Sequence, residues 1–225
     1  TIALDDPLGC APLTATFTNA SSGSQFQTWD FGDGSEPAFQ SVPSHVFANT
    51  GLEPVQYDVT LVAESAQLCV DSTTITVTVL PTPQAAFTLA DEESCTFPVD
   101  ILTANTSTGS INHSWTVNGT DAVVATAPVF SADAVGTYTV GLTATNSYGC
   151  ADQAEDDFTV HLAPIANLNA NPRIGCNPLS VNFQDLSSYS QNTSLFIDGI
   201  YDGPLPTDGL VIDQIGTFES HIVAT

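Results

Sequence analysis

The sequence contains no lysine and only one arginine, Arg173, against 25 acidic residues, so its formal net charge is −24. A surface with a single cation cannot neutralise phosphate groups, which excludes nucleic acids and anionic membranes as natural partners. The same composition predicts a protein that attracts cations and tolerates salt, because salt screens the repulsion between carboxylates beyond about 3–8 Å.

Long apolar runs and catalytic patterns are also absent. No stretch of about 18 apolar residues occurs, so we expect no membrane-spanning helix and no direct membrane insertion. The N-terminus lacks the basic start of a signal peptide, which indicates a mature or internal segment. The sequence has no zinc-type histidine spacing, no Gly-x-Ser-x-Gly elbow and no phosphate-binding loop. We therefore expect a protein that is not an enzyme and that requires no cofactor.

What the sequence does contain is a threefold repeat. Cys10, Cys95 and Cys176 recur at intervals of 85 and 81 residues, and each is followed by a proline and then by a stretch in which several apolar residues alternate with polar ones. Later in each copy, a glycine precedes a strand-like run that starts with tyrosine or phenylalanine. Such periodicity predicts tandem domains, which we place at residues 1–81, 82–163 and 164–225, the last of them truncated at its C-terminal end.

The pattern within each copy predicts an all-β fold. Runs rich in threonine and valine, such as residues 57–63, 74–79 and 136–144, show the composition and alternation of half-buried strands. No amphipathic helix is evident. About seven short strands per copy, separated by turn residues, predict a sandwich of two sheets.

One motif connects the first copy to a known family. The run Trp29-Asp30-Phe31-Gly32-Asp33-Gly34-Ser35, followed by residues 44–47, Gly51 and residues 57–63, resembles the signature of the PKD (polycystic-kidney-disease) domain. The resemblance implies immunoglobulin-like sandwiches. It also implies tandem repeats of large extracellular proteins on bacterial (Bacteroidota-type) or archaeal cell surfaces, where such modules serve as spacers or as adhesive units.

The second and third copies have decayed versions of the motif, with Trp115 but no acids in one and Leu195 in the other. This decay favours a structural role. We expect a turn, formed where aspartate accepts local hydrogen bonds and glycine supplies positive φ, and a core under it. The turn residues are Asp30, Gly32, Asp33 and Gly34, and the core residues are Trp29, Trp115, Tyr57 and Tyr138.

The five cysteines fit the repeat and the implied topology. In an immunoglobulin-like sandwich, Cys10 and Cys69 belong to loops at opposite ends, about 26 Å apart for a strand of about 8 residues, whereas a disulfide needs Cα atoms within about 7 Å. The resemblance therefore implies an interdomain Cys10–Cys150 bond. Cys69, Cys95 and Cys176 would then have partners outside the chain. Pairing within each copy and free or intermolecular thiols remain alternatives.

Acidic residues gather near the same cysteines. If neighbouring domains stack, their carboxylates converge and form a candidate calcium site, since calcium takes 6–8 oxygen ligands. The alternative is a solvated acidic face. The candidates are Asp5, Asp6, Asp152, Glu155, Asp156 and Asp157.

These observations favour a structural repeat segment of a long extracellular surface fibre or adhesin, which provides reach and stiffness and which has further copies of the same repeat as partners. Self-assembly into a filament stays open. The alternatives are a glycan- or protein-binding module, for which Tyr189 and Tyr201 are the candidate exposed aromatics, and accessory domains of a secreted hydrolase.

Overall fold

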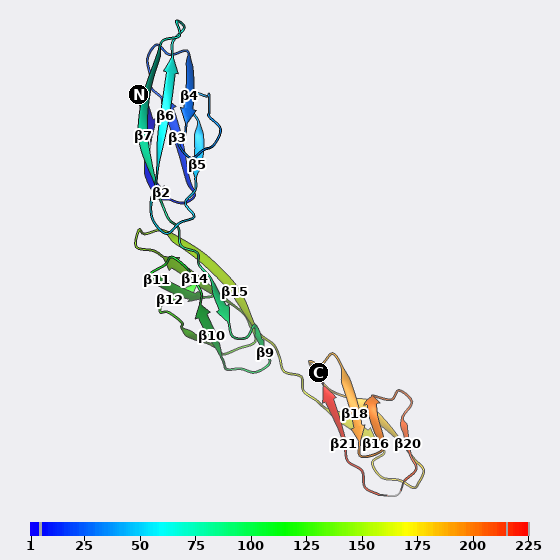
Figure 1. The fold of residues 1–225 in the computed structure, drawn as a ribbon. Coiled ribbons are helices and arrows are strands. Elements are labelled where there is room, and N and C mark those ends of the chain that lie inside the picture. Colours follow the sequence, from blue (N-terminus) through cyan, green and yellow to red (C-terminus); the bar gives the residue numbers. More distant parts are fainter. Residues whose placement is uncertain (5, 215, 225) are drawn as a thin grey trace. The chain divides into compact units, whose positions relative to one another are not determined.

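A computed structural model describes residues 1–4, 6–214 and 216–224. In this part of the chain every regular element is a strand, 21 in total, and no helix occurs. The predicted all-β class is confirmed (Figure 1). None of the described residues form a helix with the length and apolarity needed to cross a membrane.

The strands form three pairs of sheets, and each pair comes from one consecutive stretch of sequence, as expected for tandem immunoglobulin-like sandwiches. In the first pair, one sheet has the order β1 (Ile2–Leu4), β3 (Leu13–Asn19), β5 (Ser44–Phe47). The other has the order β2 (Leu8–Cys10), β7 (Val70–Leu80), β6 (Val55–Glu64), β4 (Phe26–Asp30).

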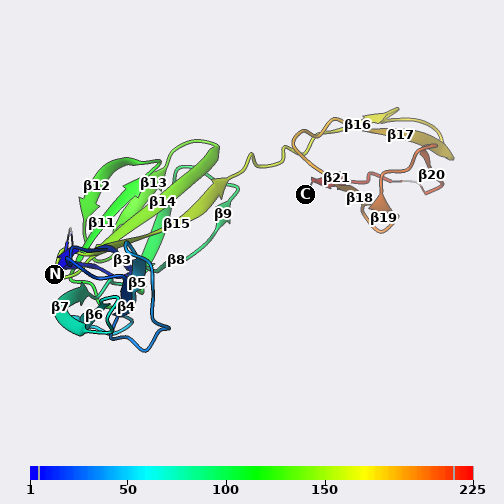
Figure 2. The same cartoon turned by 90° about the horizontal axis from the view of Figure 1, so that it is seen from above.

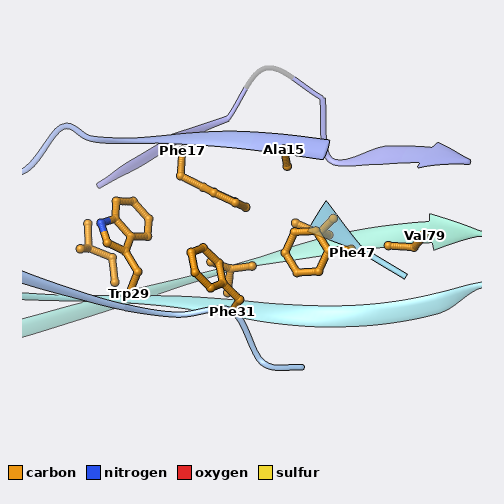
Figure 3. Close-up of a cluster of buried hydrophobic side chains, with 9 residues drawn as sticks. Ala15, Phe17, Trp29, Phe31, Phe47 and Val79 are labelled. Carbon is orange, nitrogen blue, oxygen red and sulfur yellow. The ribbon is translucent and has the colours of Figure 1, made fainter. Parts of the chain in front are cut away.

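The core of the first sandwich lies between these two sheets. Phe17 from β3 and Trp29 from β4 are both fully buried, with ring centroids 5.7 Å apart, and Phe47 from β5 packs edge-on to Phe17 (Figure 3). Strand alternation brings these rings together, because every second side chain faces the opposite sheet. Burial of each such side chain stabilises the fold by about 1.5–3 kcal/mol.

The second pair of sheets repeats this arrangement around Trp115, which is fully buried and packs edge-on to Phe87 at 5.1 Å. One sheet has the order β13 (Val129–Ala132), β10 (Val99–Asn105), β8 (Phe87–Leu89). The other has the order β12 (Thr120–Val124), β11 (Asn112–Val117), β14 (Gly136–Thr145), β15 (Ala151–Val160), β9 (Glu93–Ser94).

The third pair of sheets, the yellow-to-red strands in Figure 2, has a smaller core. Leu195 occupies the tryptophan position and is fully buried, and Val181 and Ile197 are buried as well. A cavity of about 940 Å³ lies beside these residues. The sheets have the orders β16 (Leu168–Asn171), β17 (Leu179–Asp185), β20 (Leu210–Ile212) and β19 (Tyr201–Pro204), β18 (Thr193–Ile197), β21 (Ser220–Ala224). In the described residues, β21 is an edge strand of the second of these sheets.

The chain divides into two compact units, and the limits of these units differ from the expected domain boundaries. The first unit comprises Thr1–Glu92, Asp100–Ser131 and Thr137–Phe158, and the second comprises Glu93–Val99, Ala132–Gly136 and Thr159–Thr225. The division into domains at residues 81 and 163 therefore stays a prediction from the repeat.

Candidate functional site at the disulfide

A disulfide joins Cys10 and Cys150, which lie 140 residues apart in the sequence and have a Cα–Cα distance of 5.7 Å. This is the pair expected from the implied topology, and neither cysteine bonds a cysteine of its own repeat copy. The interdomain character of the bond stays a prediction. Both bonded cysteines belong to the first compact unit, so the bond lies within this unit and does not join the two units.

Strand pairing explains why Cys10 does not bond Cys69. Strand β2 runs parallel to β7, with Cys10 opposite Leu80 at the C-terminal end of β7. Cys69 precedes the N-terminal end of the same strand, and the ten steps of about 3.3 Å between its 11 residues separate these ends by about 33 Å. Cys10 is not in a loop as expected, since it is the last residue of β2.

Asn146 holds the loop that carries Cys150. It is the one buried polar residue in the described part of the chain. Its Oδ1 atom accepts hydrogen bonds from the backbone N–H groups of Tyr148 and Cys150, both at 3.0 Å, and its Nδ2 atom donates to the carbonyl oxygen of Pro81 at 2.7 Å. Asn146 thus ties the loop to the segment that follows β7.

Further contacts connect the same segments. The carboxylate of Asp152 accepts a hydrogen bond from the backbone N–H of Ala85 at 2.9 Å, and the hydroxyl of Thr82 donates to the carbonyl oxygen of Ala11. The hydroxyl of Tyr148 donates to Glu53 at 2.9 Å, and this hydrogen bond raises the pKa of Tyr148.

The arrangement around the disulfide is suited to mechanical connection. We call the set Cys10, Cys150, Asn146, Asp152 and Thr82 the junction. Its covalent bond closes a long loop, which stabilises the folded chain by about 5 kcal/mol in the chain-entropy model. Its hydrogen bonds fix the backbone that runs past it. Sequence reasoning missed Asn146, although its position four residues before a loop cysteine was a usable signal.

The motif at residues 29–35 forms the expected turn. Asp30 accepts a hydrogen bond from the N–H of Gly32 at 2.9 Å, and Asp33 accepts one from the N–H of Ser35 at 3.1 Å. Gly32 has a φ of +76° and lies so close to the backbone of Asp58 that a Cβ atom would be 2.6 Å from its carbonyl oxygen. Gly34 also has a positive φ, +83°. The turn assignment of all four residues is confirmed.

Asp33 has a further role that the sequence did not reveal. Its Oδ2 atom lies 2.7 Å from Nε2 of His45, whose ring stacks on Phe31 at 4.0 Å. Partial burial acts to raise the pKa of Asp33, but hydrogen bonds from Ser35 and His45 outweigh it and lower this pKa from 3.8 to about 2. The carboxylate therefore pins the turn onto the sandwich.

The core assignments hold for the two tryptophans and only partly for the two tyrosines. Trp29 and Trp115 are fully buried, and each indole N–H donates to a backbone carbonyl, of Gln40 and Ala125 respectively. Tyr57 and Tyr138 are half-buried instead. The hydroxyl of Tyr57 donates to the carbonyl of Ala48, and its need for such a partner keeps the ring at the edge of the core.

The described acids among the calcium candidates do not gather into a metal site. No group of three or more metal-ligating side chains occurs among residues 1–4, 6–214 and 216–224. Protein donors occupy oxygen atoms of several candidates, because Asp6 accepts from the N–H of Leu8, Asp152 from Ala85, and Asp157 from the hydroxyl of Thr139. Glu155 and Asp156 are exposed on β15. Asp5 lies outside the described residues.

The remaining candidates are exposed to different degrees. Cys69, Cys95 and Cys176 are free and exposed, and their pairing with partners outside the chain stays a prediction. Tyr189 is 63% exposed, whereas Tyr201 is half-buried with its hydroxyl donating to the carbonyl of Pro204. Only Tyr189 therefore remains a candidate for ligand stacking.

Comparisons with known proteins identify one part of the chain. The family model described as the PKD domain matches residues 8–80. A search of curated protein sequences finds no match.

Several solved structures are similar at low identity. Fibronectin(III)-like modules of CbhA from Clostridium thermocellum share 14% identity, with a TM-score of 0.32 over 72% of this chain and 95% of theirs. A 1.5-MDa bacterial ice-binding adhesin shares 15%, with a TM-score of 0.34 over 100% of this chain and 87% of its own. A Ca²⁺-stabilized adhesin of an Antarctic bacterium shares 12%, with a TM-score of 0.34, and this chain spans 65% of its length. These values assign no function.

Proposed function

We propose, since residues 8–80 are a PKD domain, that this chain is a structural segment of a long extracellular surface fibre or adhesin and that its repeats provide reach and stiffness. The observation that carries the proposal is the Cys10–Cys150 disulfide. Cys10 belongs to the PKD domain, and Cys150 lies 70 residues beyond its last matched residue, Leu80.

The junction resists bending at the segment that leaves the PKD domain. A connection of a few residues would otherwise act as a hinge, because interfaces between domains of one chain are usually small and mobile. Here Pro81 and Ala85 are each held by a side chain from near Cys150, namely Asn146 and Asp152. A covalent bond and two backbone anchors therefore replace a free hinge.

Chemical composition supports an extracellular location. A disulfide persists in an oxidising environment and is rare in the reducing cytosol. The net charge of −24 favours solubility of the segment in water. Under this proposal the chain holds other domains at a distance from the cell and carries out no catalytic step itself.

The proposal is tested by removing the disulfide while leaving the sandwiches intact. In the double variant Cys10→Ser/Cys150→Ser, we expect faster hydrogen exchange at the amide of Ala85 and faster proteolysis between Leu80 and Phe87. Cys69→Ser removes a free, exposed thiol and is the matched control, which we expect to behave like the wild type. Equal protection of residues 81–86 in all three proteins would contradict a stiffening role.

A further inference from the structure

The exposed Cys69 lies in a loop that repeats the backbone of the Cys150 loop. The N–H of Ser65 donates to the carbonyl of Cys69 at 2.9 Å, and the N–H of Leu68 donates to the carbonyl of Ser65 at 3.0 Å. The corresponding bonds in the other loop run from Asn146 to Cys150 at 2.9 Å and from Gly149 to Asn146 at 3.2 Å. The two loops are closed in the same way.

Side chains cap the two loops in the same way as well. The hydroxyl oxygen of Ser65 accepts from the N–H groups of Gln67 and Cys69, both at 3.3 Å, as Asn146 accepts from the second and fourth residues after it. Leu68 even adopts a φ of +61°, where the other loop has a glycine. Such a conformation is strained for leucine. The Cys69 loop adopts it nonetheless, and its backbone therefore presents Cys69 as the other loop presents Cys150 to Cys10.

The exposed Cys176 lies in a loop that repeats the sequence around Cys10. Both segments read Gly-Cys-x-Pro-Leu, at residues 9–13 and 175–179. In both, the glycine lies against the leucine four residues later, so closely that a Cβ atom would overlap the leucine Cδ1 atom. The Cys95 loop differs, because it has an extra residue before its proline and because the hydroxyl of Ser94 accepts from the N–H of Thr96.

The surroundings of Cys69 and Cys176 are complementary. Cys69, Glu64 and Asp71 line one cavity of about 170 Å³. Cys176 follows Arg173, the chain's only basic residue apart from histidines. Each loop also exposes a large apolar side chain close to its cysteine in the sequence, because Leu68 is 75% exposed and Ile174 is 90% exposed.

We propose that the Cys69 loop of one molecule binds the Cys176 loop of a second copy of this chain and forms a disulfide with it. The inference rests on the proposed function, since it extends to a second molecule the bond that joins Cys10 and Cys150. Because two different loops meet, the contact is head-to-tail, and repetition produces an open chain of molecules.

The bond forms by thiol–disulfide exchange with a small disulfide such as oxidised glutathione. The thiolate of Cys69 attacks one glutathione sulfur, and the first glutathione leaves as a thiolate. The thiolate of Cys176 from the second copy then attacks the Cys69 sulfur and releases the second glutathione. Two protein thiols are oxidised to one disulfide, and one glutathione disulfide is reduced to two thiols.

The test uses the full chain, purified without reductant, incubated in a glutathione redox buffer and then trapped by alkylation. We expect a ladder of multimers on non-reducing gels. In digests, we expect the Cys69–Cys176 peptide to exceed the Cys69–Cys95, Cys69–Cys69 and Cys176–Cys176 peptides several-fold. Arg173→Gln should slow formation of the bond, and Arg173→Lys, which keeps the charge, should restore it.

The inference would be overturned by a persistent monomer, by a Cys69–Cys176 bond within one molecule, or by a statistical mixture of all thiol pairs. Equal rates for the wild type and both Arg173 variants would also overturn it, because they would mean unguided collision of thiols. The same digests report the Cys10–Cys150 peptide. Its presence without intermolecular bonds refutes only this inference, whereas its absence refutes the proposed function.

Discussion

The side-chain amide of Asn146 donates a hydrogen bond to the carbonyl oxygen of Pro81 at 2.7 Å, although 65 positions separate the two residues. The same side chain accepts two N–H groups of the Cys150 loop. One buried amide therefore satisfies three backbone groups that come from two distant parts of the sequence, and its loss leaves buried polar groups without partners.

We predict that Asn146→Ser lowers the free energy of unfolding of the first unit by about 1–3 kcal/mol, the range for one buried hydrogen-bonding group left unpaired. Serine retains an acceptor for the loop, as Ser65 does in the Cys69 loop, but it does not reach Pro81. Ser65→Asn is the matched control and should be nearly neutral. Urea unfolding measures both variants, and equal stabilities would contradict the role of Asn146.

The turn provides a second prediction, from two glycines in one motif. Gly32→Ala should destabilise the PKD domain by more than about 2 kcal/mol, since alanine at φ +76° adds strain and its Cβ atom would lie 2.6 Å from the Asp58 carbonyl. Gly34→Ala has a similar φ of +83° but nothing within 4 Å, so it should cost only about 1 kcal/mol. Thermal unfolding of both variants distinguishes strain from overlap.

A third prediction concerns acid. The pKa of Asp33 is lowered in the folded protein to about 2, whereas an unfolded aspartate has a pKa of about 3.9. A lowered folded pKa stabilises the protein at pH values above the unfolded pKa, and this stabilisation is lost as the pH falls toward 2. Because Asp33 is partly exposed to solvent, we expect a contribution of about 1 kcal/mol.

The measurement for Asp33 compares the wild type with Asp33→Asn between about pH 5 and pH 2. The wild type should be more stable at the upper limit, and the difference should shrink as the pH falls. A difference that stays constant over this range would show that the carboxylate charge does not contribute.

A fourth prediction concerns calcium. Addition of EDTA in calcium-containing buffer should leave the melting temperature unchanged, because oxygen atoms of Asp6, Asp152 and Asp157 already accept hydrogen bonds from protein donors. A melting temperature that falls with EDTA and recovers with calcium would show that the acids bind the ion together.

The sequence predicted features that depend on local patterns. The buried Trp29 follows from the alternation of apolar and polar residues, and the turn at Asp30 and Asp33 follows from turn chemistry. Both patterns are visible within a few consecutive residues. The Cys10–Cys150 pair was also predictable, because the resemblance to the PKD domain implied a topology in which Cys69 lies at the far end of the sandwich from Cys10. The first two inferences needed only one strand or one loop, whereas the cysteine pair needed the topology of a whole sandwich and its neighbour.

Features that depend on three-dimensional placement were missed. Asn146 and Pro81 meet only after the sheets have formed, and no local pattern marks the carbonyl of Pro81 as an acceptor. The described residues likewise contain no group of converging carboxylates, so calcium binding stays a prediction. Proximity in sequence suggested that Asp152 and Asp157 converge, but each carboxylate is instead held by a donor from a different segment, Ala85 and Thr139.

The central claim is that the Cys10–Cys150 bond fixes the PKD domain to the residues that follow it. Disulfide mapping of the native, non-reduced protein by mass spectrometry tests this claim most directly. The account predicts a linked peptide that contains Cys10 and Cys150. Peptides that link Cys10 to Cys69 and Cys95 to Cys150 would contradict it, because each sandwich would then be closed on itself and free to move.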